Sequence, residues 1–523
     1  MKNENYTFGR HLSYNNDSRW ADSEEMKEVP TLTNINIEAE DCTTGGIPII
    51  SDGSTAFVDG SDTHTIIFGS TGSKKTRLFG MPLINILAMA GESFVTTDPK
   101  GELFNKTSGL VQSKGYKTVV LNFRDLNQSD LWNPLAIPYE LYHNGRTEEA
   151  ISLINDLVAT LAEPQRSTAD DKYWIEMSVA QALANLLFFI DTATPEEANI
   201  YSFSNFFVQT CTPAETERLS NLTTTGSIAS LNYKSVLTNK EAEKTFANVS
   251  SGVSNMLNPF IVRKTLCQVL SKSSFDLRNL GKEKTAIYII IPDEKTTLHV
   301  LVTMFIKQTY EILINEAQSL SDRKLPNRVN FVLDEFANIP KIPDMASMIS
   351  AARSRNMRFF LIAQSQWQLL QKYGNDAHTI KGNCDNWVFL TSRERDLLEE
   401  FSFLCGNRSF IDPYGQTVDK KLITTSQLQR FKKEYGETLI LHGRNYPFVT
   451  ELPDIDEYKF KELPAMRTAD RILPQITLYD HQSVIQSIED GKRAIPFSVE
   501  VHGEEKFMKK GGDSGEKKDP FDW

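Results

Sequence analysis

The stretch Thr65-Ile-Ile-Phe-Gly-Ser-Thr-Gly-Ser-Lys-Lys-Thr76 decides the fold of this chain. The apolar run Thr65–Phe68 is typical of a buried strand, and Arg77–Met89 can continue as a helix. The loop between them, Gly69–Thr76, follows the phosphate-binding P-loop pattern G-x-x-x-x-G-K-[ST], except that Lys74 stands at the second glycine. Backbone N–H groups of such a loop form an anion nest at a helix N-terminus. We therefore predict a strand–loop–helix unit that binds nucleotide phosphate.

The residues of the loop have expected roles toward ATP and Mg²⁺. Lys75 is expected to reach the β- and γ-phosphates as a catalytic residue, and the Thr76 hydroxyl is a candidate metal ligand for Mg²⁺. At position 74 a Cβ would strain the turn, whereas an added cation would help to hold the phosphates, and the sequence leaves both interpretations open. The predicted nucleotide-binding residues are Gly69, Ser70, Thr71, Gly72, Ser73, Lys74, Lys75, Thr76 and Arg77.

Short β-branched runs alternate with helical patterns on both sides of a long helical stretch. This alternation predicts an α/β fold with a mostly parallel sheet, and the nearly all-apolar runs suit strands that are covered on both faces. The predicted strands are Thr65–Phe68, Ser93–Thr97, Thr118–Asn122, Ala286–Ile291, Val329–Leu333, Phe359–Ile362, Trp387–Leu390 and Thr438–Leu441.

The changes in character along the chain predict five segments. Residues 1–60 form an irregular N-terminal segment with a β-hairpin, and 61–165 form the first part of a nucleotide-binding domain. Residues 166–275 form an inserted all-helical domain, in which Tyr173–Ile190 has one apolar helical face. Residues 276–465 complete the nucleotide-binding domain. Residues 466–523 form a C-terminal segment whose tail, Gly503–Trp523, is expected to be disordered.

Composition narrows the class of protein. The 523 residues have an ordinary apolar content, no signal region at the start, and no apolar run near the ~20 residues that span a bilayer, so we predict a cytoplasmic protein. The five cysteines and eight histidines show no metal-ligand spacing. A net charge of −12 argues mildly against DNA as a partner, because phosphate contacts need clustered Lys and Arg.

Two carboxylates follow an apolar strand in Asn330-Phe-Val-Leu-Asp-Glu-Phe336. Ligands bind at the carboxyl ends of strands in open α/β sheets. There Asp334 would hold Mg²⁺ through water, and Glu335 would orient and deprotonate the attacking water as a catalytic residue. An exposed Asp-Glu pair at a strand end is also common, but the upstream P-loop favours the catalytic interpretation.

Gln364 stands just past the apolar strand in Phe359-Phe-Leu-Ile-Ala-Gln-Ser365. This is where a sensor of the γ-phosphate would lie, between the phosphate-binding strands. A residue that caps its own strand is the alternative, and the neighbouring motifs favour the sensor. The turn Asp98-Pro-Lys-Gly-Glu102 should present Asp98, Lys100 and Glu102 at the same edge, although as a turn alone it means little.

Arg353 and Arg355 close a predicted helix over Asp344–Ala352. In ring-shaped NTPases an arginine of this kind reaches the γ-phosphate held by the neighbouring subunit and stabilises the transition state. The alternative is that these charges complement the helix dipole. The two interpretations are evenly matched from the sequence.

Taken together, these motifs resemble the type IV coupling protein family, the hexameric P-loop ATPases of conjugative DNA transfer and type IV secretion. The resemblance covers about residues 18–465. Its matching segments are Arg19-Trp-Ala21, His64–Thr76, Val95–Phe104, Asp171–Leu187, Asn330–Asn338, Ser354–Gln364 and Gly382-Asn-Cys-Asp385.

The resemblance implies a RecA-like P-loop NTPase with an inserted all-helical domain, assembling as a homo-hexamer and using ATP and Mg²⁺. It implies a coupling ATPase that recruits a relaxase or relaxosome with single-stranded DNA, or protein substrates, to a transfer channel and its type IV secretion channel ATPases. Two alternatives stay open: a nucleotide-binding but hydrolytically weak substrate-recruiting adaptor, because of Lys74, and a P-loop DNA translocase unrelated to conjugation.

The chain departs from the family at its start. Family members usually carry transmembrane helices just before the Arg-Trp-Ala segment, whereas here 18 residues precede Arg19. We expect either a soluble variant that docks on a separate membrane anchor protein, or a chain from which the membrane part was removed. The expected location is cytoplasmic, peripheral at the inner face of the cell membrane.

Overall fold

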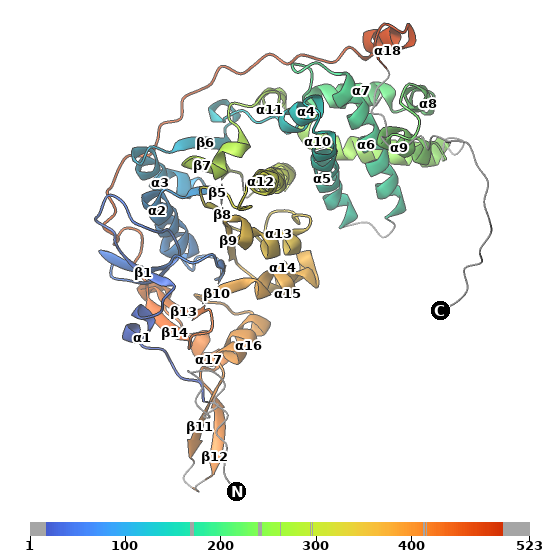
Figure 1. Ribbon diagram of the computed structural model, residues 1–523. Coiled ribbons are helices and arrows are strands. Elements are labelled where there is room, and N and C mark those ends of the chain that lie inside the picture. The colour runs from blue at the N-terminus through green and yellow to red at the C-terminus, as the bar shows by residue number, and fades with distance from the viewer. Residues whose placement is uncertain are drawn as a thin grey trace, which may run out of the picture.

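The structure is a computed structural model that describes residues 17–167, 172–238, 243–261, 263–292, 294, 296–411, 414 and 416–494. A central sheet lies between a helical region at one end and a projecting hairpin at the other (Figure 1). The predicted disorder of Gly503–Trp523 lies outside the described residues.

The central sheet has nine strands in the order β14-β13-β10-β4-β9-β8-β5-β7-β6. From β10 to β6 all neighbouring strands are parallel, which confirms the predicted mostly parallel sheet. The strand bounds are β4 His64–Phe68, β5 Ser93–Asp98, β6 Lys117–Asn122, β7 Thr285–Ile290, β8 Val329–Leu333, β9 Met357–Ala363, β10 Cys384–Phe389, β13 Glu437–His442 and β14 Phe448–Glu451.

One predicted strand has the opposite direction to the one expected. Thr438–Leu441 lies in β13, which pairs antiparallel with both β10 and β14. Its nearly all-apolar run is of the kind that predicts a parallel strand covered on both faces. A buried apolar run has no feature that records strand direction, and the short link to β14 permits only an antiparallel pair.

Alternate residues of each strand enter two different hydrophobic cores, because side chains in a strand point to opposite faces. Ile67 packs in the core that contains α2 (Met81–Ala90) and α3 (Glu102–Ser113). Ile66 packs in the core on the other face. The helices on that second face are α12 His299–Ser319, α13 Met345–Ala352, α14 Gln366–Tyr373, α15 Asp376–Gly382 and α16 Arg395–Leu404.

The helix after the P-loop begins with a π-helical turn, η1 (Thr76–Gly80), which continues into α2. This confirms the helix predicted over Arg77–Met89. It ends at Gly91, which has φ 74° and so provides the left-handed residue that commonly closes a helix. Nearly every residue of α2 is buried, so the loop is attached to a rigid element.

A helical region is inserted between β6 and β7. The predicted helix Tyr173–Ile190 is confirmed as α6, and the structure extends it to Thr192. α5 already packs against α6 and α12, ahead of the proposed boundary at 165/166. The helices of this region are α4 Ala136–His143, α5 Thr147–Arg166, α6 Tyr173–Thr192, α7 Ile200–Thr210, α8 Pro213–Asn221, α9 Ile228–Leu237, α10 Glu243–Ile261 and α11 Lys264–Val269.

Among the described residues, α6 is the one helix that is long and apolar enough to cross a membrane, although the sequence suggested that no run reached that length. In this structure 72% of its apolar window is buried inside the fold. Core helices of soluble proteins have the same length and composition, so this helix is weak evidence for a membrane span.

The N-terminal part forms a three-stranded antiparallel sheet, β1-β3-β2, with α1 (Ser23–Lys27) before it. The expected hairpin is β2 (Pro48–Ser51) with β3 (Thr55–Asp59), while β1 (Leu32–Asn36) was not predicted. A second hairpin, β11 (Asn407–Ile411) and β12 (Thr417–Lys421), projects from the body and is followed by the short helix α17 (Thr425–Leu428) (Figure 1).

The C-terminal segment after β14 runs along the outside of α2 and α3 and ends at α18 (His481–Glu489), beside the helical region (Figure 1). Ser108 Oγ accepts a hydrogen bond from the Met466 N–H at 3.0 Å. Further along, the buried Tyr479 ring packs against Phe189 and Phe206. This segment therefore links the nucleotide-binding region to the helical region.

Candidate functional site

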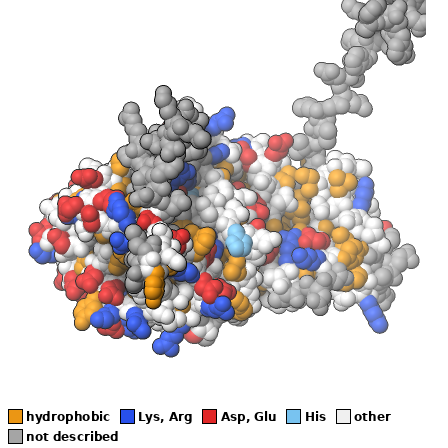
Figure 2. Space-filling view, turned by 90° about the horizontal axis from the view of Figure 1, so that it is seen from below, with side chains coloured by type: hydrophobic (Ala, Val, Ile, Leu, Met, Phe, Trp, Pro, Cys, Tyr) orange, Lys and Arg blue, Asp and Glu red, His pale blue; other side chains and the backbone are white. Residues whose placement is uncertain are grey.

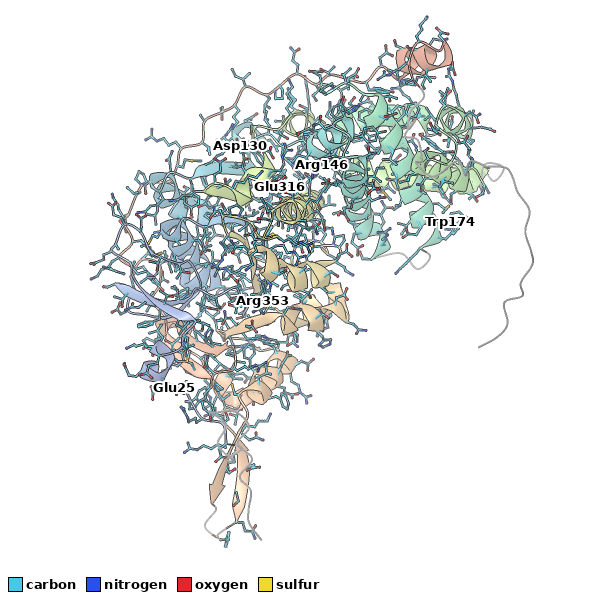
Figure 3. The ribbon with its side chains drawn as sticks, viewed as in Figure 1. Glu25, Asp130, Arg146, Trp174, Glu316 and Arg353 are labelled. Atoms are coloured by element: carbon cyan, nitrogen blue, oxygen red, sulfur yellow. The ribbon has the colours of Figure 1, made fainter. Side chains whose placement is uncertain are left out.

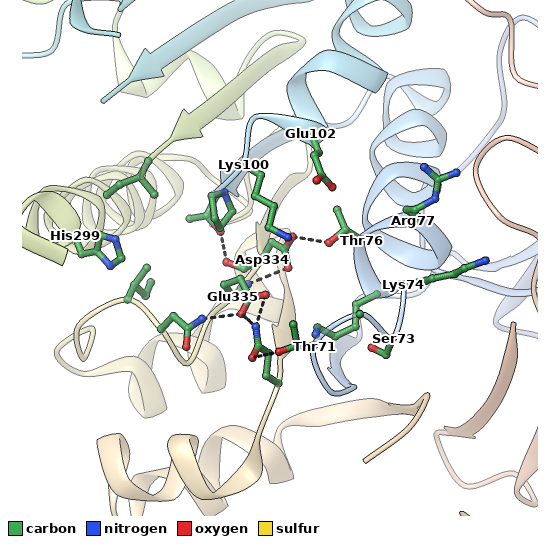
Figure 4. Close-up of a pocket in the computed structure, with 18 residues that line it drawn as sticks. Thr71, Ser73, Lys74, Thr76, Arg77, Lys100, Glu102, His299, Asp334 and Glu335 are labelled. Carbon is green, nitrogen blue, oxygen red and sulfur yellow. Dashed lines mark hydrogen bonds between the residues drawn. The ribbon is translucent and has the colours of Figure 1, made fainter. Parts of the chain in front are cut away.

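A pocket of about 520 Å³ opens at the carboxyl ends of the parallel strands (Figure 4). P-loop residues 71–77 form one wall, and the ends of β5, β7, β8 and β9 form the others. Parallel strands bring their carboxyl ends to one edge, so the P-loop and the ends of four further strands meet here.

The P-loop lysine is folded inside its own loop. Lys75 Nζ donates to the Gly69 carbonyl at 2.6 Å and to the Ser70 carbonyl at 3.4 Å. Burial lowers the pKa of Lys75, and the charges of Glu335 and Asp334 oppose that shift. A Cβ on Gly69 would meet Ser73 Oγ at 2.4 Å, which explains the glycine there.

Thr76 and Asp334 meet as the motif predicts. Thr76 Oγ1 donates to Asp334 Oδ2 at 2.9 Å, and Thr97 Oγ1 donates to the Asp334 carbonyl at 2.7 Å. Burial, followed by the neighbouring charge of Glu335, raises the pKa of Asp334 to about 6. A hydroxyl and a carboxylate side by side are hard oxygen donors, the kind of ligand that suits Mg²⁺.

Glu335 is held by a chain of amide hydrogen bonds. Gln364 Nε2 donates to its two carboxylate oxygens at 2.7 and 2.6 Å, and Asn338 Nδ2 donates at 2.8 Å. Gln364 Oε1 in turn accepts from Thr71 Oγ1 at 3.0 Å. The structure thus connects the P-loop to Glu335 through Gln364.

The two predicted arginines are not brought into this pocket. The predicted helix forms as α13, and Arg353–Arg355 follow it as a 3-10 turn. Both precede β9 and so lie at its amino end, whereas the pocket lies at the carboxyl end. Arg353, labelled in Figure 3, pairs with Asp385 at 3.0 Å. The sequence pattern places these arginines before a strand but does not reveal how far from the pocket the fold puts them.

Lys74 and Arg77 direct their side chains away from Asp334 and Glu335 (Figure 4). Lys74 Nζ lies 3.2 Å from Asp454 Oδ2, and Arg77 Nε donates to the same oxygen at 3.0 Å. Lys74 has φ 66°, so the backbone takes the left-handed conformation that the missing glycine would have favoured.

Several residues that line the pocket were not assigned to the site from the sequence: Thr97, Pro99, Lys100, Glu102, Ile291, His299, Asn338 and Ile339. Lys100 lies in the turn after β5 and Glu102 begins α3, whereas Asp98 ends β5 and its carboxylate accepts from the Phe104 N–H in the first turn of α3. His299 Nε2 bonds the Pro292 carbonyl at 2.9 Å, and its Nδ1 has no partner within the described ranges. No local pattern marks His299.

Replacing Asp334 with asparagine should stabilise the protein at neutral pH when divalent cations are absent. The folded chain binds the Asp334 proton more tightly than the unfolded chain, so stability falls as the pH rises from about 4 to about 6, and the full cost is present above that. The substitution removes this cost, up to about 3 kcal/mol. Thermal unfolding in EDTA should show a higher midpoint for the variant at about pH 7.5 and a smaller gap at about pH 5. If the midpoints of variant and wild type differ by the same amount at both pH values, the raised pKa of Asp334 is contradicted.

A P-loop that faces two carboxylates at the carboxyl edge of a parallel sheet defines a P-loop NTPase with a RecA-like fold. The chain belongs to the type IV secretory system conjugative DNA transfer family, whose profile matches residues 19–433. This confirms the family indicated by the sequence motifs.

Two curated relatives are the VirD4 proteins of Rhizobium radiobacter and Agrobacterium fabrum. The first is 23% identical over 368 residues, covering 67% of this chain and 49% of the relative. The second is 23% identical over 426 residues, covering 77% and 58%. The chain therefore spans about half the length of the curated relatives it matches.

Among solved structures, the bacterial conjugative coupling protein TrwB matches with a TM-score of 0.61 at 14% identity, covering 88% of this chain and 97% of that one. TrwB in complex with ADP and Mg²⁺ matches with a TM-score of 0.57 at 14% identity, covering 87% and 95%. At this identity the likeness confirms the fold.

Proposed function

We propose that this protein is the coupling ATPase of a conjugative type IV secretion system, which recruits a relaxase–DNA complex or a protein substrate and drives its transfer by ATP hydrolysis. The observation that carries the proposal is the meeting of the P-loop with Asp334, Glu335 and Gln364 in one pocket. Family membership supports the conjugative role, and the complex of TrwB with ADP and Mg²⁺ supports the choice of nucleotide and metal.

Each of these pocket residues would have a separate role in phosphoryl transfer. Lys75 would supply positive charge to the β- and γ-phosphates, and Thr76 and Asp334 would hold Mg²⁺. The bound metal would neutralise charge on the phosphates. Glu335 would accept a proton from the attacking water, and Gln364 and Asn338 fix its carboxylate for that task. Because Gln364 also contacts Thr71, it is suited to sense the γ-phosphate.

The proposal includes assembly of this chain as a homo-hexamer. A homo-hexamer would let Arg353 or Arg355 approach the nucleotide of a neighbouring subunit, since neither arginine lies at its own pocket. The ring would work in the cytoplasm at the inner face of the membrane, with a relaxase or relaxosome, channel ATPases and a separate membrane anchor protein as partners.

Contact with single-stranded DNA would need a local basic surface. On the face seen in Figure 2, the Lys and Arg side chains of the described residues are interspersed with Asp and Glu. That face offers no broad basic area among the described residues, in keeping with a net charge of −12. A surface that becomes continuous in the assembled ring is the better candidate.

The test is ATP hydrolysis by the full chain with and without single-stranded DNA. A coupling ATPase should hydrolyse ATP in this assay, and single-stranded DNA should raise the rate. A chain that binds nucleotide but shows no turnover under either condition would instead be the recruiting adaptor. Recovery of neither a relaxase nor a channel ATPase in pull-downs from donor cells would favour a translocase unrelated to conjugation.

A further inference from the structure

The P-loop is tied to the turn that follows β14 through the residue that replaces its second glycine. Lys74 contributes to the wall of the phosphate pocket and also to a neighbouring pocket of about 490 Å³, which Asp454 lines as well. The ammonium group lies on the Asp454 side, 3.2 Å from the carboxylate. Figure 4 shows the Lys74 side chain leading away from Asp334 and Glu335.

The backbone at Lys74 needs such an anchor. Its φ of 66° lies in the left-handed region, where a Cβ crowds the following carbonyl oxygen. A non-glycine residue keeps such a conformation when surrounding contacts hold it there. The Asp454 carboxylate is a contact of that kind, because it lies on the far side of the loop from the pocket and carries the opposite charge.

Asp454 is itself rigidly placed. Its side chain is 15% exposed, and it also pairs with Arg77, the second residue after Lys75. The Asp454 N–H donates to Glu457 Oε2 at 2.6 Å, which closes the turn after β14. Two glycines let neighbouring backbone approach this turn. A Cβ on Gly436 would lie 2.1 Å from the Leu452 carbonyl oxygen, and one on Gly53 would lie 2.6 Å from that of Glu457.

We propose that Asp454 is a positioning residue for nucleotide binding, which holds the Lys74 ammonium outside the phosphate pocket and fixes the left-handed turn of the P-loop in place of the missing glycine. Lys75 and Lys100, which also line this pocket, are then left to face the phosphates. This inference rests on the proposed function, because it requires that the pocket binds nucleotide phosphates.

The test is a double-mutant cycle on the full chain, read out by equilibrium binding of a fluorescent ATP analogue with Mg²⁺ and by KM and kcat of ATP hydrolysis. Asp454→Asn should weaken binding about fivefold and raise KM with little change in kcat, because the chemical residues are untouched. In a Lys74→Gly background the same Asp454→Asn change should have no further effect, because glycine needs no anchor.

Asp456→Asn is the matched control, since Asp456 pairs with Arg77 and Lys106 but not with Lys74. It should bind nucleotide as the wild type does. The inference is overturned if Asp454→Asn binds normally or more tightly, if Asp456→Asn is equally impaired, or if Lys74→Gly fails to rescue Asp454→Asn. Failure of the wild type and of Lys74→Gly to bind nucleotide at all would instead contradict the proposed function.

Discussion

Replacing Glu335 with glutamine should lower the rate of ATP hydrolysis by about 10²–10⁴, the usual contribution of a positioned general base. Glutamine keeps the size of the side chain, but it cannot take up the proton of the attacking water. Its amide nitrogen also cannot accept the hydrogen bonds that a carboxylate oxygen accepts from the Gln364 and Asn338 amides. ATP binding should persist, because Lys75 and Thr76 are unchanged. Phosphate release under saturating ATP measures the hydrolysis rate, and equilibrium binding of the nucleotide measures whether ATP binding persists.

Glu399→Gln serves as the control for that substitution. Glu399 lies on α16 and pairs with the exposed Arg395, outside the residues that line the pocket. Its turnover should match that of the wild type. If Glu335→Gln hydrolyses ATP at the wild-type rate, Glu335 is a strand-end carboxylate without a role in the chemistry.

Replacing Lys75 with alanine should lower ATP turnover by about 10²–10³, the loss typical of removing one preorganised group that stabilises transition-state charge. Nucleotide binding should weaken as well, because the ammonium group acts on the phosphates in both the ground state and the transition state. Titration of a fluorescent ATP analogue and phosphate release measure the two effects. This joint loss distinguishes Lys75 from Glu335.

Lys459→Ala provides a matched control, since Lys459 is exposed and pairs with Glu38 on the outer surface. Both its affinity and its turnover should equal those of the wild type. Undiminished affinity and turnover in Lys75→Ala would show that phosphates do not bind at the P-loop, and would remove the basis for the proposed ATPase.

Much of the sheet was predictable because each strand is a short apolar run that ends in polar residues. The runs at β4 and β8 therefore also located Thr76 and Asp334, which meet at 2.9 Å. The direction of a strand was not predictable in the same way, because a run buried on both faces has the same composition in parallel and antiparallel pairs. The parallel direction predicted for β13 was therefore wrong.

The parts of the site that the sequence did not predict depend on contacts between residues far apart in the chain. Asp454 lies 380 residues after Lys74, so neither local spacing nor composition links the two. His299 begins a helix with no surrounding motif, and only the fold turns it toward the pocket. Arg353 fits the pattern of an arginine at the end of a helix. It lies away from the pocket of its own chain because it precedes β9, whereas the pocket lies at the carboxyl end of that strand.

Conjugative transfer from donor cells whose only copy of this chain carries Glu335→Gln tests most directly whether ATP hydrolysis in this pocket drives transfer. The variant should accumulate to the wild-type level and bind ATP, yet transfer should fall below detection. Transfer at the wild-type frequency, with the variant chain confirmed as the only copy, would contradict the account.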